Sequence, residues 1–181
     1  ASCRLLDSEG SETALESLWT EQPALVVFIR HFSCIACSEN VEGLLPRLEE
    51  LHALGIRTAL VGNGPRLSIN GFMESRRLLH QPVEVYTDPT LEVHRLAGLH
   101  RSVFRSWGPR AGWEALRALL AGHVQTGFDG DSQQQGGALL IDTSGEIAYR
   151  HQNRSLGDHA PANDLVAAAL TLYARRNPEA G

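Results

Sequence analysis

Short runs of apolar residues alternate with apolar residues at helical spacing along most of the chain. The first run, Leu25–Ile29 after Pro23, is apolar at every position and is typical of a strand buried on both faces. Beyond it, apolar residues recur every three or four positions over Val41–Leu54, which predicts an amphipathic helix. Pro46 should kink this helix, and Gly55 should end it.

The alternation continues after Gly55. The pattern predicts a strand at Thr58–Val61, a helix at Phe72–Leu79 and a strand at Val83–Tyr86. A short helix should follow up to Gly98, with Asp88 as its N-cap and Pro89 at its first position. The sequence Gly62-Asn63-Gly64 predicts a tight turn, since it lacks the third glycine of a dinucleotide-binding loop.

The last part of the chain predicts a hairpin and a closing helix. Gly137–Asp142 and Ile147–Tyr149 form the hairpin, and Leu165–Ala174 is helical. The stretch 101–135 fits least well, and we expect a helical insertion packed by its own tryptophans, the alternative being a lid over a substrate. The result is an α/β fold: a mixed central sheet with helices on both faces, in one domain spanning residues 1–181.

Composition narrows the classes of function. The 181 residues, 43% of them apolar, suffice for one sizeable core. The net charge of −5 comes without a basic stripe, so nucleic acid is not expected as a partner. Every basic residue is an arginine, which excludes a lysine-based phosphate loop or Schiff base. No apolar window is long enough to span a bilayer, so a membrane is not expected as a partner either.

Cysteine usage bears on the compartment. Three cysteines, two of them three positions apart, do not form the dispersed framework of a disulfide-stapled secreted protein, so we expect a cytoplasmic location. Cys3 has no evident partner in the sequence. A disordered terminal thiol is the favoured interpretation, with a third redox residue as the alternative.

The strongest chemical signal is the pair Cys34 and Cys37, between a buried strand and a helix. Cysteines at this spacing are close enough to bridge, and the first faces unpaired backbone N–H groups that stabilise a thiolate. Cys34 is therefore the candidate nucleophile and Cys37 the candidate resolving thiol. Arg30 and His31 precede the loop, where a cation favours the thiolate. Because side chains alternate along a strand, we expect one of these two to face the site.

Two other interpretations of the cysteine pair stay open. The cysteines are structural and buried, or they form half of a zinc site completed by some of the eight histidines, for which His31 has suitable spacing. Redox chemistry is favoured, because a closed zinc site needs four ligands and the chain has no second cysteine pair. No bound metal is therefore expected.

Several motifs together resemble one known family. They are Phe28–Cys37, Gly62-Asn63-Gly64, Tyr86–Pro89, Gly136-Gly137 and Gly157–His159. Their order resembles the peroxiredoxin-like AhpC/TSA group, which includes prostamide/prostaglandin F synthase, over about residues 23–170. The resemblance implies a thioredoxin-like fold, a reactive first cysteine and reduction of a peroxide-type substrate. It also implies no bound cofactor, with electrons from thioredoxin or another external thiol donor. Arg154, Asp158 and His159 match the group too, although a solvated turn is the favoured interpretation there.

The chain departs from related patterns at two places. A typical peroxiredoxin has Pro and Thr seven and three residues before its peroxidatic cysteine, where this chain has Val27 and His31. In thioredoxins a cis-proline faces the cysteine pair, and Gly137 stands at the corresponding position. We therefore expect Gly137 to lie opposite the pair and to alter how substrate is positioned.

These observations predict a thiol-dependent oxidoreductase. The Cys34 thiolate attacks the O–O bond of a peroxide or the S–S bond of a disulfide, and Cys37 closes an intramolecular disulfide that an external thiol donor opens. The alternative is a non-catalytic thioredoxin-like module whose cysteines sense redox state or bind a metal. Turnover of peroxides or disulfides separates the two hypotheses.

Overall fold

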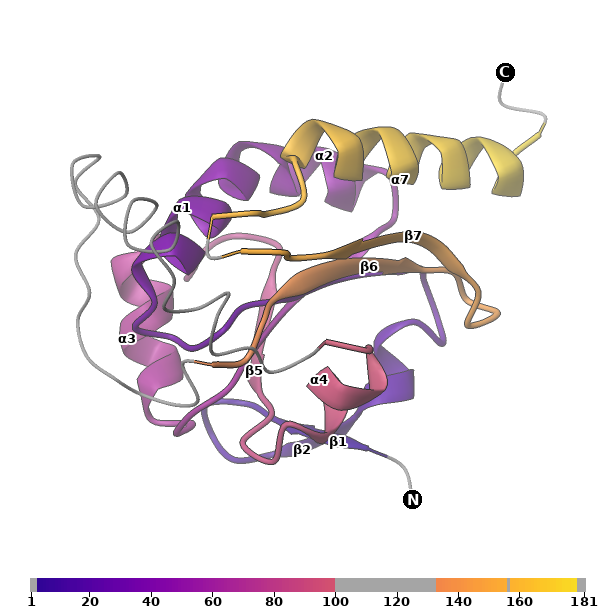
Figure 1. Ribbon diagram of the computed structural model, residues 1–181. Coiled ribbons are helices and arrows are strands. Elements are labelled where there is room, and N and C mark those ends of the chain that lie inside the picture. The colour runs from indigo at the N-terminus through magenta and orange to yellow at the C-terminus, as the bar shows by residue number, and fades with distance from the viewer. Residues whose placement is uncertain (1–2, 100–132, 156, 179–181) are drawn as a thin grey trace.

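The computed structural model (Figure 1) describes residues 3–99, 133–155 and 157–178, and seven strands within these ranges form one mixed sheet. In sheet order the strands are β2 (Glu12–Ala14), β1 (Arg4–Leu6), β5 (Glu84–Thr87), β4 (Arg57–Gly62), β3 (Ala24–Phe28), β6 (Gly137–Ile141) and β7 (Ile147–Gln152). β3, β4 and β5 run parallel, and the other neighbouring pairs are antiparallel. The predicted mixed sheet is confirmed.

The apolar run after Pro23 forms β3, between β4 and β6. All its residues are buried. Because side chains alternate along a strand, Leu25 and Val27 join the core on one face, while Val26 and Phe28 join the core on the other. An entirely apolar strand is therefore required at this position, as the sequence predicts.

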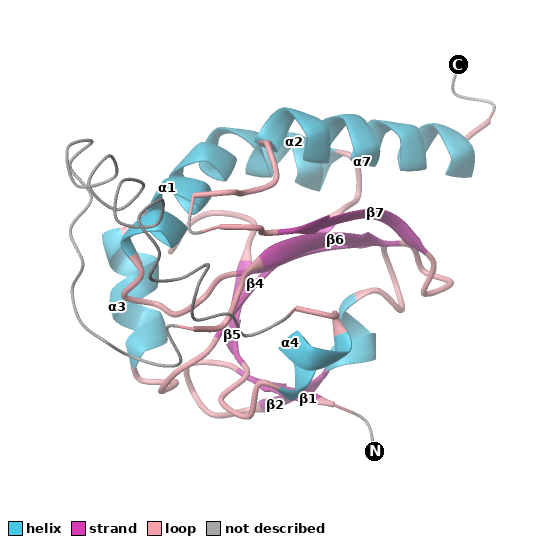
Figure 2. Cartoon of the chain, viewed as in Figure 1, coloured by secondary structure: helices cyan, strands magenta, loops and turns pink. Residues whose placement is uncertain are grey.

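Helices cover both faces of the sheet. On the Leu25 side lie α1 (Ile35–Leu44), α2 (Leu48–Ala53), α3 (Ser68–Ser75) and α7 (Ala162–Arg176). On the Phe28 side lie α4 (Glu92–Leu96) and the short 3-10 helix η1 (Leu15–Leu18). Figure 2 shows α1, α2 and α7 on one side of β6 and β7, with α4 on the other.

The long helix predicted after the cysteines is interrupted at Pro46. α1 ends at Leu44, and the 3-10 segment η2 (Leu45–Arg47), which contains Pro46, separates it from α2. Pro46 cannot donate a backbone hydrogen bond to the preceding turn, which accounts for the change in helix geometry. Gly55 follows α2 with φ of 70°, in the left-handed region that favours glycine at a helix end.

The two helices that flank β5 begin and end at other residues than predicted. α3 covers Ser68–Ser75 because the backbone turns left-handed at Arg77, with φ of 58°, and the Leu78 N–H closes the end on the Met73 carbonyl at 2.8 Å. The apolar Leu78 and Leu79 therefore lie beyond the helix. α4 begins at Glu92 rather than at Pro89, since Leu91 has φ of 57° and breaks the helical path.

The N-terminal hairpin of β1 and β2 was not predicted, because each strand has only three residues and too few positions to show alternation. The residue after the hairpin holds Cys3: the Leu15 N–H, at the start of η1, donates to the Cys3 carbonyl at 2.9 Å, and Cys3 is only 8% exposed. The prediction of a disordered terminal thiol is therefore wrong, and Cys3 belongs to the core on the Phe28 side.

The helical insertion predicted at 101–135 lies almost wholly outside the described residues. Its last part is described, and Gln134 and Gln135 are buried there, just before β6. Gln134 donates through Nε2 to the Leu99 carbonyl at 3.2 Å, which joins the end of α4 to the start of β6.

Candidate active site

The cysteine loop leaves the sheet at the end of β3. Phe28, the last residue of β3, pairs with Val61 of β4 on one side and with Gly137 of β6 on the other. Parallel strands bring their carboxyl ends to one edge of a sheet, so the turns after β3, β4 and β5 lie together there. This edge contains the residues that position Cys34.

Cys34 is the N-cap residue of α1. Its backbone is extended, its Sγ accepts from the Cys37 N–H at 3.4 Å, and its own N–H donates to the His31 carbonyl at 3.1 Å. The sulfur therefore occupies the position where a helix start stabilises negative charge. Cys34 is 4% exposed, and no disulfide joins it to Cys37.

Cys37 lies one turn into α1 and is buried. Burial, the hydrogen bond to Cys34 and the negative charge of Cys34 raise the pKa of the Cys37 thiol well above its ordinary value. The charge of Arg30 and the Arg30 N–H act in the opposite direction. Cys37 is therefore held as a neutral thiol beside a sulfur that faces the helix start.

Arg30 and His31 are both buried next to the pair. The Arg30 N–H donates to Cys37 Sγ at 3.3 Å, and its Nε donates to the Gln134 carbonyl at 3.1 Å. His31 supplies the carbonyl that accepts from the Cys34 N–H. The cation of Arg30 thus acts electrostatically on Cys37, whereas His31 shapes the loop through its backbone.

The turn after β4 supports the cysteine loop. Asn63 is buried and donates through Nδ2 to the Arg30 carbonyl. The Phe32 ring lies so close to Gly62 that a Cβ there would be 2.8 Å from Phe32 Cε1. Gly64, with φ of 118°, completes the tight turn that was predicted. Sequence reasoning assigned no site role to Asn63 or Gly62, although both belong to the motif Gly62-Asn63-Gly64.

Gly136 and Gly137 lead into β6 beside this loop. A Cβ at Gly136 would collide with the Phe28 carbonyl oxygen. A Cβ at Gly137 would lie 2.5 Å from the His151 carbonyl oxygen and 2.9 Å from Leu99 Cδ2. The close contacts that require glycine at 137 are therefore with β7 and Leu99. A position of Gly137 opposite the cysteine pair stays a prediction.

A second polar pair, Asp88 and His94, is fully buried at the end of β5. Asp88 Oδ2 lies 3.0 Å from His94 Nδ1 and accepts the His94 backbone N–H at 3.0 Å, while Oδ1 accepts from Glu92 and Thr90. His94 Nε2 lies 3.4 Å from the Ile29 carbonyl, directly before the cysteine loop. Asp88 was predicted only as an N-cap. Its carboxylate does accept N–H groups at the start of α4, but the residue at the N-cap position is Leu91.

Opposing effects act on the pKa of Asp88. Burial raises it, whereas the hydrogen bonds from the His94 ring and backbone, and the charge of His94, together lower it by more. The net result is a pKa below the ordinary 3.8. The carboxylate is therefore the stable form of Asp88 in the folded protein near neutral pH.

Neither a metal cluster nor a membrane-spanning helix occurs among the residues that the structure describes. No three His, Cys, Asp or Glu side chains there are grouped to bind a metal ion. No helix in the same ranges is both long and apolar enough to cross a bilayer.

Known proteins resemble the chain over most of its length. Residues 43–155 match the family described as AhpC/TSA antioxidant enzyme, a match that begins after Cys37. The chain is 31% identical to human peroxiredoxin-like 2C over 175 residues, covering 90% of this chain and 75% of the human protein. It is 30% identical over 177 residues to the prostamide/prostaglandin F synthase of Salmo salar, covering 95% of this chain and 85% of the salmon protein.

Solved structures share the fold at lower identity. Peroxidoxin BcpB from Mycobacterium tuberculosis has a TM-score of 0.65 and 16% identity, covering 95% of this chain and 94% of its own. The thioredoxin domain of a thiol-disulfide oxidoreductase from Bacteroides vulgatus has a TM-score of 0.53 and 13% identity, with 96% and 94% covered. The predicted thioredoxin-like fold is confirmed.

Proposed function

Because the chain belongs to the AhpC/TSA family of antioxidant enzymes, we propose that it is a thiol-dependent oxidoreductase with Cys34 as its nucleophile. Its substrate is a peroxide, or alternatively a disulfide, and Cys37 resolves the intermediate. The observation that carries the proposal is the asymmetry of the pair. Cys34 Sγ caps the start of α1, while the Cys37 thiol is buried behind it with a raised pKa.

In the first step the Cys34 thiolate attacks one oxygen of a hydroperoxide. A sulfur–oxygen bond forms and the O–O bond breaks, and the leaving alkoxide takes up a proton and departs as an alcohol. Two electrons pass from sulfur to the peroxide, which leaves Cys34 as a sulfenic acid. The N–H groups at the start of α1 stabilise the thiolate that begins this step.

In the second step Cys37 attacks the sulfenic sulfur of Cys34. An S–S bond forms, the S–O bond breaks, and the hydroxyl leaves as water with the Cys37 proton. Oxidation removes the negative charge of Cys34, which is one cause of the raised pKa of Cys37. Cys37 therefore loses its proton more easily after the first step than before it, and the nearby Arg30 favours the resulting thiolate.

An external dithiol of the thioredoxin type completes the cycle. One donor thiolate attacks the Cys34–Cys37 disulfide and forms a mixed disulfide with one of the two cysteines. The second donor thiol then attacks the donor sulfur of that mixed disulfide and releases the cysteine, so the donor leaves as a disulfide and both cysteines are thiols again. This scheme needs no bound cofactor or metal. It needs no nucleic acid and no membrane, and we propose a cytoplasmic location.

The test is NADPH consumption with thioredoxin and thioredoxin reductase, across a panel of peroxides and disulfides. The wild-type chain should turn over at least one of them. Cys34→Ser should abolish turnover, and Cys37→Ser should stop after one turnover with a trapped Cys34 sulfenic acid or a mixed disulfide. Cys3→Ser is the matched control and should retain turnover. Turnover by Cys34→Ser at the wild-type rate contradicts the proposal. If the wild-type chain turns over none of the substrates, the result supports the non-catalytic module instead.

A further inference from the structure

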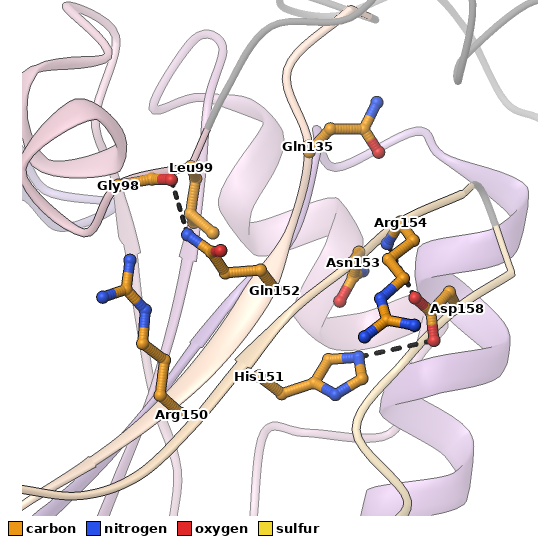
Figure 3. Close-up of a pocket in the computed structure, with 9 residues that line it drawn as sticks. All are labelled: Gly98, Leu99, Gln135, Arg150, His151, Gln152, Asn153, Arg154 and Asp158. Carbon is orange, nitrogen blue, oxygen red and sulfur yellow. Dashed lines mark hydrogen bonds and ion pairs between the residues drawn. The ribbon is translucent and has the colours of Figure 1, made fainter.

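A polar pocket of about 620 Å³ opens where β7 ends, beside the end of α4 and the start of β6 (Figure 3). Its described lining includes Arg150, His151, Asn153, Arg154, Asp158 and Gln135. The volume lies in the range of small-molecule sites in proteins. The mechanism above gives this pocket no role.

The polar pocket lies at the same edge of the sheet as the cysteine loop. Gln152 at the end of β7 pairs with Gly137, which pairs with Phe28 at the end of β3. Gln134 provides a second connection, because it donates to the Leu99 carbonyl at the pocket wall and accepts from Arg30 Nε. Arg30 in turn donates its backbone N–H to Cys37. One hydrogen-bonded chain thus links the pocket to the cysteine pair.

The charges in the polar pocket do not balance. Among the described lining residues, two arginines face one carboxylate, an excess of positive charge in a chain whose net charge is −5. Asp158 is already engaged: Oδ2 accepts the Arg154 backbone N–H at 2.7 Å, and Oδ1 lies 3.5 Å from His151 Nε2. Within the described ranges, neither arginine guanidinium forms an ion pair with a carboxylate.

The two arginines differ in what else they contact. Arg150 donates from its guanidinium to the Ala97 carbonyl at 3.1 Å, which fixes it against α4. Arg154 is exposed and belongs to the turn after β7. Asn153 and Gln135 are buried in the lining and add neutral amides. Arg154 is therefore the group that can reorient to pair with an incoming anion.

We infer that the polar pocket binds the carboxylate of a small organic molecule that reacts at Cys34. This inference rests on the proposed function and names its substrate class. A single carboxylate matches the excess charge of the pocket, and a guanidinium binds it with two parallel hydrogen bonds. The carboxylate belongs either to the oxidant, an organic hydroperoxide, or to the reductant, a thiol such as glutathione.

Binding is tested first, without any redox chemistry. Octanoate and octanol have the same chain length and differ in charge, and their affinities for the wild-type chain are compared by NMR titration. Octanoate should bind more tightly, and Arg154→Gln should weaken octanoate binding by at least about tenfold, because the variant loses the charge and the two parallel hydrogen bonds of the guanidinium. Arg175→Gln, which removes an exposed arginine from α7, is the matched control and should change nothing. Equal octanoate affinity in wild type and Arg154→Gln overturns the inference.

Kinetics then distinguish the two sources of the carboxylate. The rate of turnover with linoleic acid hydroperoxide is compared with the rate with its methyl ester. If the preference for the free acid falls about tenfold in Arg154→Gln, the pocket belongs to the oxidant. The same fall in the preference for glutathione over dithiothreitol assigns it to the reductant. Arg154-dependent octanoate binding in a chain that turns over no peroxide or disulfide supports the pocket and contradicts the proposed function. Turnover of a peroxide or disulfide, together with octanoate binding that is equal in wild type and Arg154→Gln, supports the proposed function and contradicts the inference about the pocket.

Discussion

Two buried polar pairs lie at one edge of the sheet, and the chain holds them in different ways. Cys34 and Cys37 follow β3 and belong to the core on the Leu25 side. Asp88 and His94 follow β5, and the His94 ring packs edge-on against Phe28 on the other side, with ring centroids 5.2 Å apart. The backbone at Ile29 connects the two regions, because its carbonyl faces His94 and the cysteine loop follows directly.

The difference lies in the strength of the hydrogen bonds. Asp88 accepts from two backbone N–H groups, a hydroxyl and the His94 ring, all between 2.9 and 3.2 Å. The cysteine sulfurs accept backbone N–H groups at 3.3 and 3.4 Å, and sulfur is a weak acceptor. The first pair is therefore a fixed support, and the second keeps thiols that can change partners. In this fold a rigid pair stabilises the loop on which a reactive pair sits.

The largest effect on stability is expected from Asp88→Ala. Removing the carboxylate leaves the buried His94 N–H and ring and the partly buried Glu92 N–H without this acceptor, at about 1–3 kcal/mol each, so the free energy of unfolding should fall by about 4 kcal/mol or more. Urea denaturation measures it. A double variant that also carries His94→Leu should recover part of the loss, because it removes one of the orphaned donors. A loss below about 1 kcal/mol contradicts the role of this pair as a support.

A somewhat smaller loss is expected from Gly137→Val. Its Cβ would lie 2.5 Å from a backbone oxygen of β7, so the hairpin must shift, and we expect a destabilisation of about 3 kcal/mol. Gly43→Ala in α1 is the matched control. No atom lies within 4 Å of a Cβ there, and it should stabilise the chain by about 0.5–1 kcal/mol. Unchanged stability with lost turnover in Gly137→Val would instead show that this glycine serves substrate access.

Acid should weaken the Asp88 support in a defined direction. The pKa of Asp88 is lower in the folded chain than the ordinary 3.8, so its contribution is fully present above that value and is lost as the pH falls below it. The wild-type urea midpoint should therefore fall more steeply below pH 3.8 than that of Asp88→Asn. Parallel pH profiles for the two proteins argue against a lowered pKa.

The smallest effect on stability is expected from Cys34→Ser. Serine is a good N-cap residue, and its hydroxyl can accept the Cys37 N–H in place of the thiol. The free energy of unfolding should change by less than about 1 kcal/mol, although turnover is lost. A much larger loss measured by urea denaturation would mean that Cys34 is a structural residue like Asp88.

Most of the elements that position the site could be predicted from the sequence, because their patterns are local. β3 is apolar throughout, Pro46 interrupts a helical repeat, and the spacing of Cys34 and Cys37 at a helix start identifies the candidate reactive pair. The three-residue strands of the N-terminal hairpin are too short to show a pattern, so the burial of Cys3 was missed with them.

The supports of the site depend on contacts between distant residues, which no local pattern contains. Asn63 reaches the Arg30 carbonyl across the sheet edge, and His94 reaches Ile29 from α4. The backbone is left-handed at Leu91, and the Asp88 carboxylate lies 3.0 Å from the His94 ring, where the sequence suggested only a helix cap. Motif order identified the family, but the roles of these side chains required the structure.

Timed alkylation over a pH series tests most directly whether Cys34 is the nucleophile and Cys37 the protected, resolving thiol. Peptide mapping after iodoacetamide treatment reads both cysteines in one sample. Cys34 should react first, with a midpoint below the roughly 8.5 of a free cysteine, and Cys37 should react later and at higher pH. Faster alkylation of Cys37, or an unshifted midpoint for Cys34, contradicts these roles of the two cysteines.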